Sequence, residues 1–298
     1  MAFSSIISLL DNISEKINIF IIHSNSNLLN VIPLNIKNHP NLQELNIYKF
    51  NKEKHNFPNV EDSHVSEATY YRLFLQDYIP EETQFLLYLD ADVICTKNPL
   101  FYIKKMIGDI EKNKFIISAH TQPGLPEVDK RSIELGVTSG RYFNAGVMLI
   151  DVKKWKNLNI KSKALEIIIQ KNTELILWDQ DVLNIIFNGK YQELDENFNY
   201  RMDILEFNEH EVRKLEKNVH LIHYFGKSKP WSIKGVNYGI SEYYQKEFRK
   251  LGKGRYHIVH NWRKGSILYL LKTFSTGKIF TIRHPFSFVW ESIKSFFK

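Results

Sequence analysis

Short apolar runs alternate with longer amphipathic segments along the first 190 residues or so of the chain. Five runs predict buried strands, because they are short, rich in β-branched and aromatic residues, and bounded by polar or turn-forming residues. These strands are expected at residues 17–22, 45–50, 85–89, 115–119 and 147–150, and helices at residues 65–78, 99–107, 161–171 and 178–187. Strands that alternate with helices predict an α/β protein built around a mostly parallel sheet. Ligands of such sheets bind where the strands end, so polar residues at strand ends are the first candidates for a functional site.

The composition is that of an ordinary globular protein. The 298 residues are 43% hydrophobic and 24% charged, which excludes a disordered, collagen-like or coiled-coil chain. A single cysteine, Cys95, excludes an intramolecular disulfide framework and a cysteine-cluster zinc site. No uninterrupted apolar run is longer than five residues, and the first ten residues lack the basic flank of a secretion signal. We therefore expect a soluble, cytoplasmic protein.

The net charge of +7 is concentrated at one end of the chain. Residues 249–298 contain eleven lysine and arginine residues and one acid, whereas the preceding 248 residues carry a small negative charge. A mildly acidic body argues against a protein that binds nucleic acid over its whole surface. The same fifty residues contain ten aromatic side chains, including Trp262, Trp290, Phe296 and Phe297. Basic residues interleaved with aromatic ones are typical of a segment that lies on an anionic membrane surface, although a solvated extension has the same composition.

The apolar run at residues 85–89 ends in Asp90-Ala91-Asp92. In extended backbone, two carboxylates at i and i+2 point to the same side of the sheet, where they can share one hard cation. A pair of aspartates that caps a turn is the structural alternative. A phosphatase of the haloacid-dehalogenase kind also has an Asp-x-Asp after an apolar strand. There, however, the pair usually lies near the chain start and precedes Gly-Thr, not Val93-Ile94 as here.

Two further segments bring amide and acidic side chains next to apolar runs. Asn144, Ala145 and Gly146 come just before the run at 147–150; small residues let a ligand approach the backbone, and an amide can recognise a hydroxyl. A turn onto a core strand explains the same pattern. Asp179-Gln180-Asp181 lies at a predicted helix start, where the helix dipole favours acids without any function.

A fourth segment contains histidine, glycine and lysine. An apolar stretch ends in His223, and a turn with Gly226 then presents Lys229. Imidazole together with carboxylates can complete a metal site, and a lysine beside a glycine suits a diphosphate. Taken alone, His223 is better explained as a hydrogen-bonded core or turn residue than as a metal ligand.

Together with the segment from His64 to Leu75 and with Lys153-Lys154-Trp155, these motifs resemble glycosyltransferase family 8. The likeness is strongest to the bacterial lipooligosaccharide galactosyl- and glucosyltransferases, and it covers about residues 3–250. It implies a GT-A fold, which is a Rossmann-like mixed sheet flanked by helices, here followed by a basic helical extension. It also implies a retaining transferase that uses a UDP-hexose and a divalent metal, usually Mn²⁺, with Mg²⁺ also possible.

The same resemblance assigns roles to individual residues. Asp90, Asp92 and His223 would hold the metal, and Gly226 and Lys229 would grip the diphosphate. The donor sugar would contact Arg72, Asp90, Asn144, Ala145, Asp179 and Gln180. Gln180 and Asp181 are the catalytic candidates, because a carbonyl or carboxylate oxygen near the anomeric carbon would stabilise an oxocarbenium-like sugar. His64 would face the acceptor.

The start of the chain departs from the family pattern. Family members usually open with a strand and a loop that contacts uridine, whereas residues 1–10 here match the helix that follows that loop. We therefore expect the first strand and the uridine-reading residues to be missing. A sheet without that strand would leave an apolar face uncovered, with Met1 and Phe3 close to solvent.

The sequence thus predicts a nucleotide-sugar transferase domain at residues 1–250 and a basic, aromatic, membrane-peripheral tail at residues 251–298. The expected reaction moves a hexose from a UDP-sugar to a glycan or glycolipid acceptor of the lipopolysaccharide type, at the inner face of the plasma membrane. No nucleic acid partner is expected. The alternative is a catalytically impaired homologue that binds a sugar or nucleotide without turnover.

Overall fold

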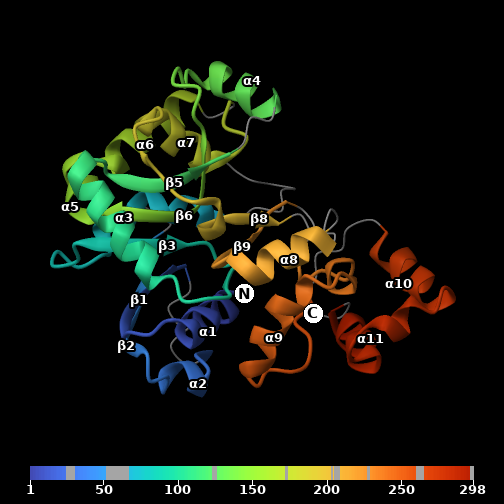
Figure 1. Cartoon of the computed structure of the whole chain (residues 1–298). Helices are drawn as coiled ribbons and strands as arrows, with labels where there is room; N and C mark the ends of the chain where they lie inside the picture. The colour runs from blue at the N-terminus through green and yellow to red at the C-terminus, as the bar shows by residue number, and fades with distance from the viewer. Residues whose placement is uncertain are drawn as a thin grey trace.

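The structure is a computed structural model that describes residues 1–24, 31–51, 67–122, 126–171, 174–202, 204, 209–226, 229–259 and 265–295. Its described strands form three sheets (Figure 1). The first is a parallel pair of β1 (Ile17–His23) and β2 (Leu42–Lys49). The central sheet has the order β3 (Phe85–Leu89), β6 (Phe143–Asp151), β5 (Ile117–Thr121) and β7 (Gln192–Glu193). The third sheet has the order β4 (Val93–Cys95), β9 (Leu221–Tyr224) and β8 (Tyr200–Met202).

Helices surround these sheets and form the C-terminal end of the described chain. The α-helices are α1 (Ala2–Asn12), α2 (Leu34–Lys37), α3 (Leu100–Asn113), α4 (Pro126–Leu135), α5 (Val152–Asn157), α6 (Ile160–Lys171), α7 (Trp178–Phe187), α8 (Glu209–Asn218), α9 (Ser241–Lys250), α10 (Ser266–Ser275) and α11 (Pro285–Ser295). The 3₁₀ helices are η3 (Glu67–Asp77), η4 (Glu196–Phe198), η5 (Gly235–Asn237) and η6 (Lys278–Thr281).

The α/β class and all five expected strands are confirmed, but the sheets are mixed and not mostly parallel. β6 runs antiparallel to both β3 and β5, and β4 runs antiparallel to β9. The connection from β5 to β6 contains α4. It begins and ends at the same end of the two neighbouring strands, so they run in opposite directions. The alternation of strands and helices in the sequence does not reveal this return.

The helix expected at residues 65–78 is a 3₁₀ helix, η3, over Glu67–Asp77, and residues 65 and 66 lie outside the described part. A 3₁₀ helix has three residues per turn, so residues at i and i+3 are eclipsed. Thr69 and Arg72 are such a pair, and the Nε–H of Arg72 donates to the Thr69 carbonyl at 3.2 Å. This winding sets the direction in which the Arg72 side chain leaves the helix.

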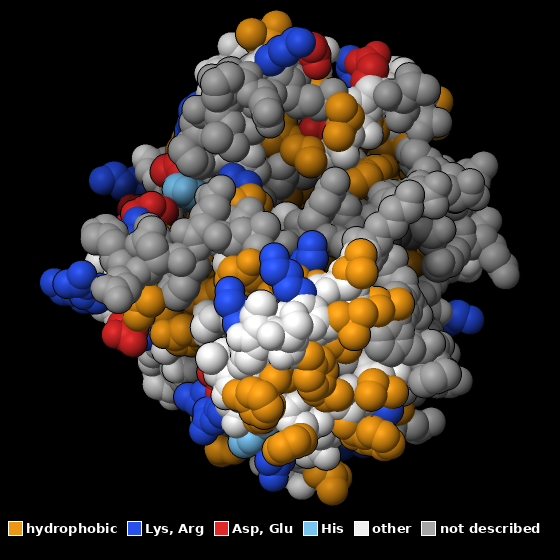
Figure 2. Space-filling view, turned by 90° about the vertical axis from the view of Figure 1, so that its right-hand side faces the viewer, with side chains coloured by type: hydrophobic (Ala, Val, Ile, Leu, Met, Phe, Trp, Pro, Cys, Tyr) orange, Lys and Arg blue, Asp and Glu red, His pale blue; other side chains and the backbone are white. Residues whose placement is uncertain are grey.

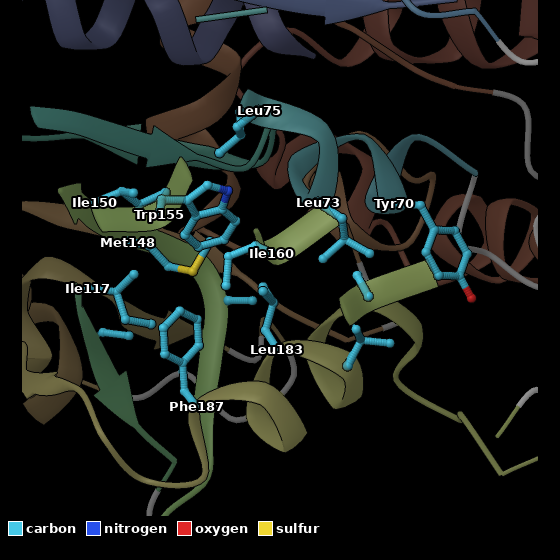
Figure 3. Close-up of a cluster of buried hydrophobic side chains, with 14 of the residues drawn as sticks. Tyr70, Leu73, Leu75, Ile117, Met148, Ile150, Trp155, Ile160, Leu183 and Phe187 are labelled. Carbon is cyan, nitrogen blue, oxygen red and sulfur yellow. The ribbon is translucent and has the colours of Figure 1, made fainter. Parts of the chain in front are cut away.

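The largest core cluster lies between the central sheet and the helices η3, α5, α6 and α7 (Figure 3). Trp155 of α5 is buried at its centre, with Met148 and Ile150 of β6 close to its ring in Figure 3 and Phe187 of α7 at a ring-centroid distance of 6.0 Å. Helix α3 packs on the opposite face of the sheet, where Met106 joins a smaller apolar cluster with Val147. The central sheet is therefore covered on both faces.

A second core cluster joins the third sheet to α1 and α9, both of which belong to the expected nucleotide-sugar domain. Leu10 of α1 and Tyr244 of α9 are fully buried there. At the beginning of the chain Met1 is 48% exposed, and Phe3 is half-buried. The sequence-based expectation that Met1 and Phe3 lie close to solvent is confirmed for Met1 and is wrong for Phe3, which packs against the second core cluster.

The C-terminal helices α10 and α11 pack against the body through a third apolar cluster. Phe288 and Ile279 of the C-terminal segment contact Ile233 and Val236, which lie a few residues after Lys229 along the chain. No helix in the described ranges has the length and apolar character needed to cross a membrane.

The core around Trp155 allows a test of the fold. Replacing Trp155 with Ala should lower the free energy of unfolding by about 3–5 kcal/mol, because the removed indole leaves a cavity between the sheet and α7. Urea denaturation followed by circular dichroism measures this change. Phe101 of α3 is 74% exposed and provides the control, since Phe101→Ala should change stability by less than about 0.5 kcal/mol. Equal stability losses in the two variants would contradict the assignment of Trp155 to the core.

Candidate functional site

Asp90 and Asp92 lie where the central sheet meets the third sheet. They occupy a turn between β3 and β4, in which the Val93 N–H donates to the Asp90 carbonyl at 3.1 Å. The Asp90 N–H donates to the Gly146 carbonyl of β6 at 2.8 Å. The prediction that Asp90 and Asp92 lie on extended backbone is therefore wrong. The two carboxylates converge because a turn joins the edge strands of two sheets.

Each of these aspartates contacts a cationic side chain through one carboxylate oxygen. Its second oxygen makes no contact with that cation. Asp90 Oδ1 accepts from Arg72 Nη2 and from the Tyr88 hydroxyl, both at 2.7 Å. Asp92 Oδ2 accepts from Lys229 Nζ at 2.6 Å, and the same ammonium donates to the Tyr224 carbonyl. Asp90 Oδ2 and Asp92 Oδ1 are therefore the oxygens that remain available to a ligand.

His223 of β9 completes this group. Its Nε2 lies 3.4 Å from Asp92 Oδ1 and 3.9 Å from Asp90 Oδ2. Its Nδ1 lies 2.8 Å from Asn199 Oδ1, and Asn199 Nδ2 donates to Asn144 Oδ1 at 2.9 Å. Because Asn199 Oδ1 accepts, Nδ1 of His223 donates to it, and Nε2 is the ring nitrogen that faces the two carboxylates.

The three side chains fit a divalent metal ion. Their ligand atoms all lie within 4.8 Å of one another, and Asp92 Oδ1 is buried without a hydrogen-bond partner. Although burial raises the pKa of Asp92, the neighbouring His223 and Lys229 lower it well below its usual value, so the carboxylate is ionised. Two carboxylate oxygens and one imidazole nitrogen suit Mn²⁺ or Mg²⁺.

Gly146 provides the space in which the His223 ring lies. A Cβ atom at this position would be 2.2 Å from His223 Cε1 and 2.9 Å from Asp90 Oδ2. From the sequence alone, the small residues here predict the close approach of a ligand to the backbone. The structure instead shows that the missing side chain makes room for one of the three candidate metal ligands.

Arg72 connects three elements of the site. Besides Asp90 after β3, it contacts the Ala145 carbonyl of β6 through Nη1 and Asp179 of α7, whose Oδ2 lies 2.8 Å from Nε. Burial alone would lower the pKa of the guanidinium, but Asp179 and Asp90 raise it above its usual range. Burial, with a contribution from Asp90 and against that of Arg72, raises the pKa of Asp179 to about 7.

Gln180 is held by the strand that contains Asn144. Its Oε1 accepts from Asn144 Nδ2 and from the Ala145 N–H, both at 3.1 Å. Two donors already occupy this oxygen, so the amide nitrogen is the group that remains available to a ligand. This geometry disfavours the expected role of the Gln180 carbonyl beside a positively charged sugar.

Asp181 is fully buried, and both of its oxygens are bonded within the protein. Oδ1 accepts from the Tyr142 hydroxyl, and Oδ2 accepts from the Ile176 and Leu177 N–H groups at 2.9 Å. Asp181 thus fixes the chain that leads into α7. This arrangement favours a structural role for Asp181 over the contact with substrate expected from the sequence.

The remaining expected site residues differ in how far the structure describes them. Lys229 joins the metal-ligand group through Asp92, whereas Gly226, with a positive φ of 74°, lies in the exposed turn after β9. His64, the expected acceptor residue, lies outside the described residues. Sequence reasoning missed Asn199 and Tyr88, each of which orients a candidate metal ligand. In the sequence, their one distinguishing feature is a polar group in or next to an apolar strand, which many residues share.

The sequences of two curated relatives align with more than half of this chain. A lipopolysaccharide 1,3-galactosyltransferase of Salmonella typhimurium is 35% identical over 186 residues, which are 59% of this chain and 52% of that protein. A lipopolysaccharide 1,2-glucosyltransferase of Escherichia coli is 31% identical over 192 residues, which are 60% of this chain and 53% of that protein. The chain therefore spans about half the length of these relatives.

Solved structures support the fold. Galactosyltransferase LgtC in complex with donor and acceptor sugar analogues superimposes with a TM-score of 0.67 at 22% identity, covering 89% of this chain and 96% of that one. Glycosyltransferase GlyE of Streptococcus pneumoniae superimposes with a TM-score of 0.56 at 19% identity, covering 93% and 61%. Both likenesses indicate the GT-A fold.

The family model described as glycosyl transferase family 8 matches residues 1–235. This match takes in most of the chain, including all three candidate metal ligands, and we conclude that the chain belongs to glycosyltransferase family 8.

Proposed function

We propose that this chain is a retaining, metal-dependent hexosyltransferase that moves a hexose from a UDP-sugar to a glycan or glycolipid of the lipopolysaccharide type. One observation carries the proposal: the free oxygens of Asp90 and Asp92 face Nε2 of His223. The names of the curated relatives, lipopolysaccharide galactosyl- and glucosyltransferases, support the hexose and the class of acceptor.

Asp90, Asp92 and His223 would hold Mn²⁺ or Mg²⁺. When bound there, the ion would supply Lewis-acid stabilisation of the negative charge that develops on the departing UDP. Lys229 supplies a second positive charge on the same side, and its link to Asp92 holds the ammonium in position. The turn at Gly226 would offer backbone N–H groups to the diphosphate.

The donor sugar would lie against Asp90, Asn144, Ala145 and Gln180, with Arg72 and Asp179 behind them. All three nitrogens of the Arg72 guanidinium contact protein oxygens, so this residue orients Asp90 and Asp179. The Gln180 amide nitrogen would donate to the substrate near the anomeric carbon. His64 is the proposed acceptor residue.

We also propose that residues 1–250 form the transferase domain and that residues 251–298 attach it to the anionic inner face of the plasma membrane. Exposed apolar side chains recur at helical spacing on α10 and α11, including Leu268 at 72% and Phe286 at 83% exposure. Figure 2 shows this face, on which hydrophobic side chains gather and lysine or arginine side chains lie around them. An apolar surface surrounded by positive charge complements an anionic bilayer.

The first prediction for this function concerns the metal. Purified protein should release UDP from at least one UDP-hexose when Mn²⁺ is present. Excess chelator should reduce this rate by at least about tenfold, because the single positive charge of Lys229 cannot replace a divalent ion at the departing UDP. A panel of UDP-hexoses with a UDP-detection assay measures this rate. Turnover that is unaffected by chelator would exclude the metal. Binding of UDP with no turnover of any donor would instead favour the impaired homologue.

Gly146→Ala should weaken the binding of Mn²⁺ in the presence of UDP by about 10–100-fold, because the new Cβ displaces the buried His223 ring. Titration calorimetry measures the affinity. Gly108 of α3 is the matched control, since a Cβ atom there has no neighbour within 4 Å. Gly108→Ala should bind Mn²⁺ as the parent does. An unchanged affinity in Gly146→Ala would remove His223 from the proposed ligand set.

The membrane proposal predicts that Phe286→Ser reduces binding to phosphatidylcholine vesicles that contain phosphatidylglycerol by about tenfold, the effect of removing one exposed aromatic side chain from the interface. Co-sedimentation at low salt measures the bound fraction. Phe101→Ser changes a similarly exposed aromatic residue on α3 and should have no effect. Failure of the parent protein to bind these vesicles would leave α10 and α11 with a purely structural role.

A further inference from the structure

Arg201 lies directly beside the candidate metal ligand His223. β8 and β9 pair in parallel, and Arg201 is the register partner of His223. Side chains at matched positions of neighbouring strands emerge on the same face of a sheet, about 4.8 Å apart at the backbone. Arg201 therefore projects on the face of the third sheet that carries the site.

The guanidinium of Arg201 is half-buried and has no acidic partner among the described residues. Its carbon lies 4.2 Å from the centre of the Phe225 ring, and its Nε is buried without a hydrogen-bond partner. Burial lowers the pKa of this guanidinium, and none of the described carboxylates lies near enough to raise it. An arginine nevertheless stays protonated at every physiological pH. The chain thus carries a fixed and poorly solvated positive charge at this position.

Two other arginines of the protein show what is unusual here. Arg72 is also buried, but two carboxylates neutralise it. Arg141 also stacks on an aromatic ring, that of Tyr191 at 4.1 Å, but its Nη2 donates to Glu193 at 2.9 Å. Among these, only Arg201 combines an aromatic support with an unneutralised charge.

A purely structural role accounts poorly for Arg201. A cation–π contact contributes about 0.5–2 kcal/mol, and part of that gain offsets the cost of removing the guanidinium from water. An apolar side chain would pack on Phe225 without that cost. By contrast, a guanidinium held flat on an aromatic ring keeps its outer N–H groups free, and these match the oxygens of a phosphate or carboxylate.

The strand order separates Arg201 from the proposed diphosphate site. The order is β4-β9-β8, so the turn with Asp92, which holds Lys229, lies on one side of His223 and Arg201 lies on the other. Given the transferase function proposed above, the diphosphate is bound on the β4 side. An anion bound by Arg201 would therefore belong to a part of the donor or acceptor other than the diphosphate.

We infer that Arg201 binds an anionic group, a phosphate or a carboxylate, that the acceptor carries near the hydroxyl to be glycosylated. The site thus selects acidic acceptors over neutral ones. This inference rests on the proposed transferase function.

The test uses the full chain saturated with UDP and Mg²⁺ and titrated with inorganic phosphate. Arg201→Met should weaken phosphate binding by about tenfold or more, the scale of a charged hydrogen bond, and should leave UDP affinity within about twofold of the parent. Arg141→Gln is the matched control and should leave both affinities unchanged. The Tm of Arg201→Met should stay equal or rise, because the substitution removes an unneutralised charge and keeps an apolar contact with Phe225.

Several results would overturn the inference. They are equal phosphate binding by Arg201→Met and the parent, no phosphate binding by the parent, or a tenfold loss of UDP affinity in Arg201→Met, which would assign the residue to the donor diphosphate. If Arg201→Met does not fold, Arg201→Lys keeps the charge without the planar fork and should give an intermediate phosphate affinity. Failure of the parent to bind UDP would contradict the proposed function. The phosphate titration without nucleotide would then still compare the parent with Arg201→Met.

Kinetics provides a second readout that a structural role would not move. With a core oligosaccharide used before and after phosphatase treatment, the parent should have a lower KM for the phosphorylated form. Arg201→Met should lose this preference while kcat for the dephosphorylated form stays unchanged. A preference that persists in the variant would contradict acceptor recognition by Arg201.

Discussion

The buried guanidinium of Arg72 is the interaction on which the site depends. A charge removed from water must be neutralised by nearby opposite charge, and Arg72 obtains this from Asp90 and Asp179, which belong to elements far apart in the sequence. Its contact with the Ala145 carbonyl adds β6 to the same assembly. The orientation of Asp90 that leaves Oδ2 free is therefore a consequence of charge neutralisation.

The position of the site follows from a seam between two sheets. The central sheet contributes Asn144 and Gly146, and the third sheet contributes His223, with Asn199 just before β8. The hydrogen bond from Asn199 to Asn144 crosses this seam and links the proposed donor-sugar residues to the histidine that would bind metal. A displacement of one sheet relative to the other would thus disturb the proposed metal ligands and sugar contacts together.

Residues with distinctive chemistry were found from the sequence, and residues that act through geometry were not. The motif at Asp90 and Asp92 stood out because two acids interrupt an apolar pattern, and the structure brings both to His223 as expected. The turn that makes the two carboxylates converge could not be predicted from the sequence. It depends on the pairing of β3 with β6 and of β4 with β9, and each pair joins strands that are far apart in the chain. Asp181 had the same sequence signal as its neighbours, yet it is enclosed and bonded to backbone N–H groups. Only tertiary packing separates these two kinds of acid.

One short stretch of chain ties Lys229 to the C-terminal helices. Ile233 and Val236, which anchor α10 and α11, follow Lys229 closely, and the Lys229 carbonyl accepts hydrogen bonds from the backbone and the hydroxyl of Ser232. A protein attached to a bilayer through α10 and α11 would hold its reaction centre at a fixed height and tilt above the lipid headgroups. Its encounters with lipid-linked acceptors would then become a search in two dimensions. The spacing between Lys229 and the two helices would set how far from the membrane the acceptor end of a glycan can lie and still reach the site.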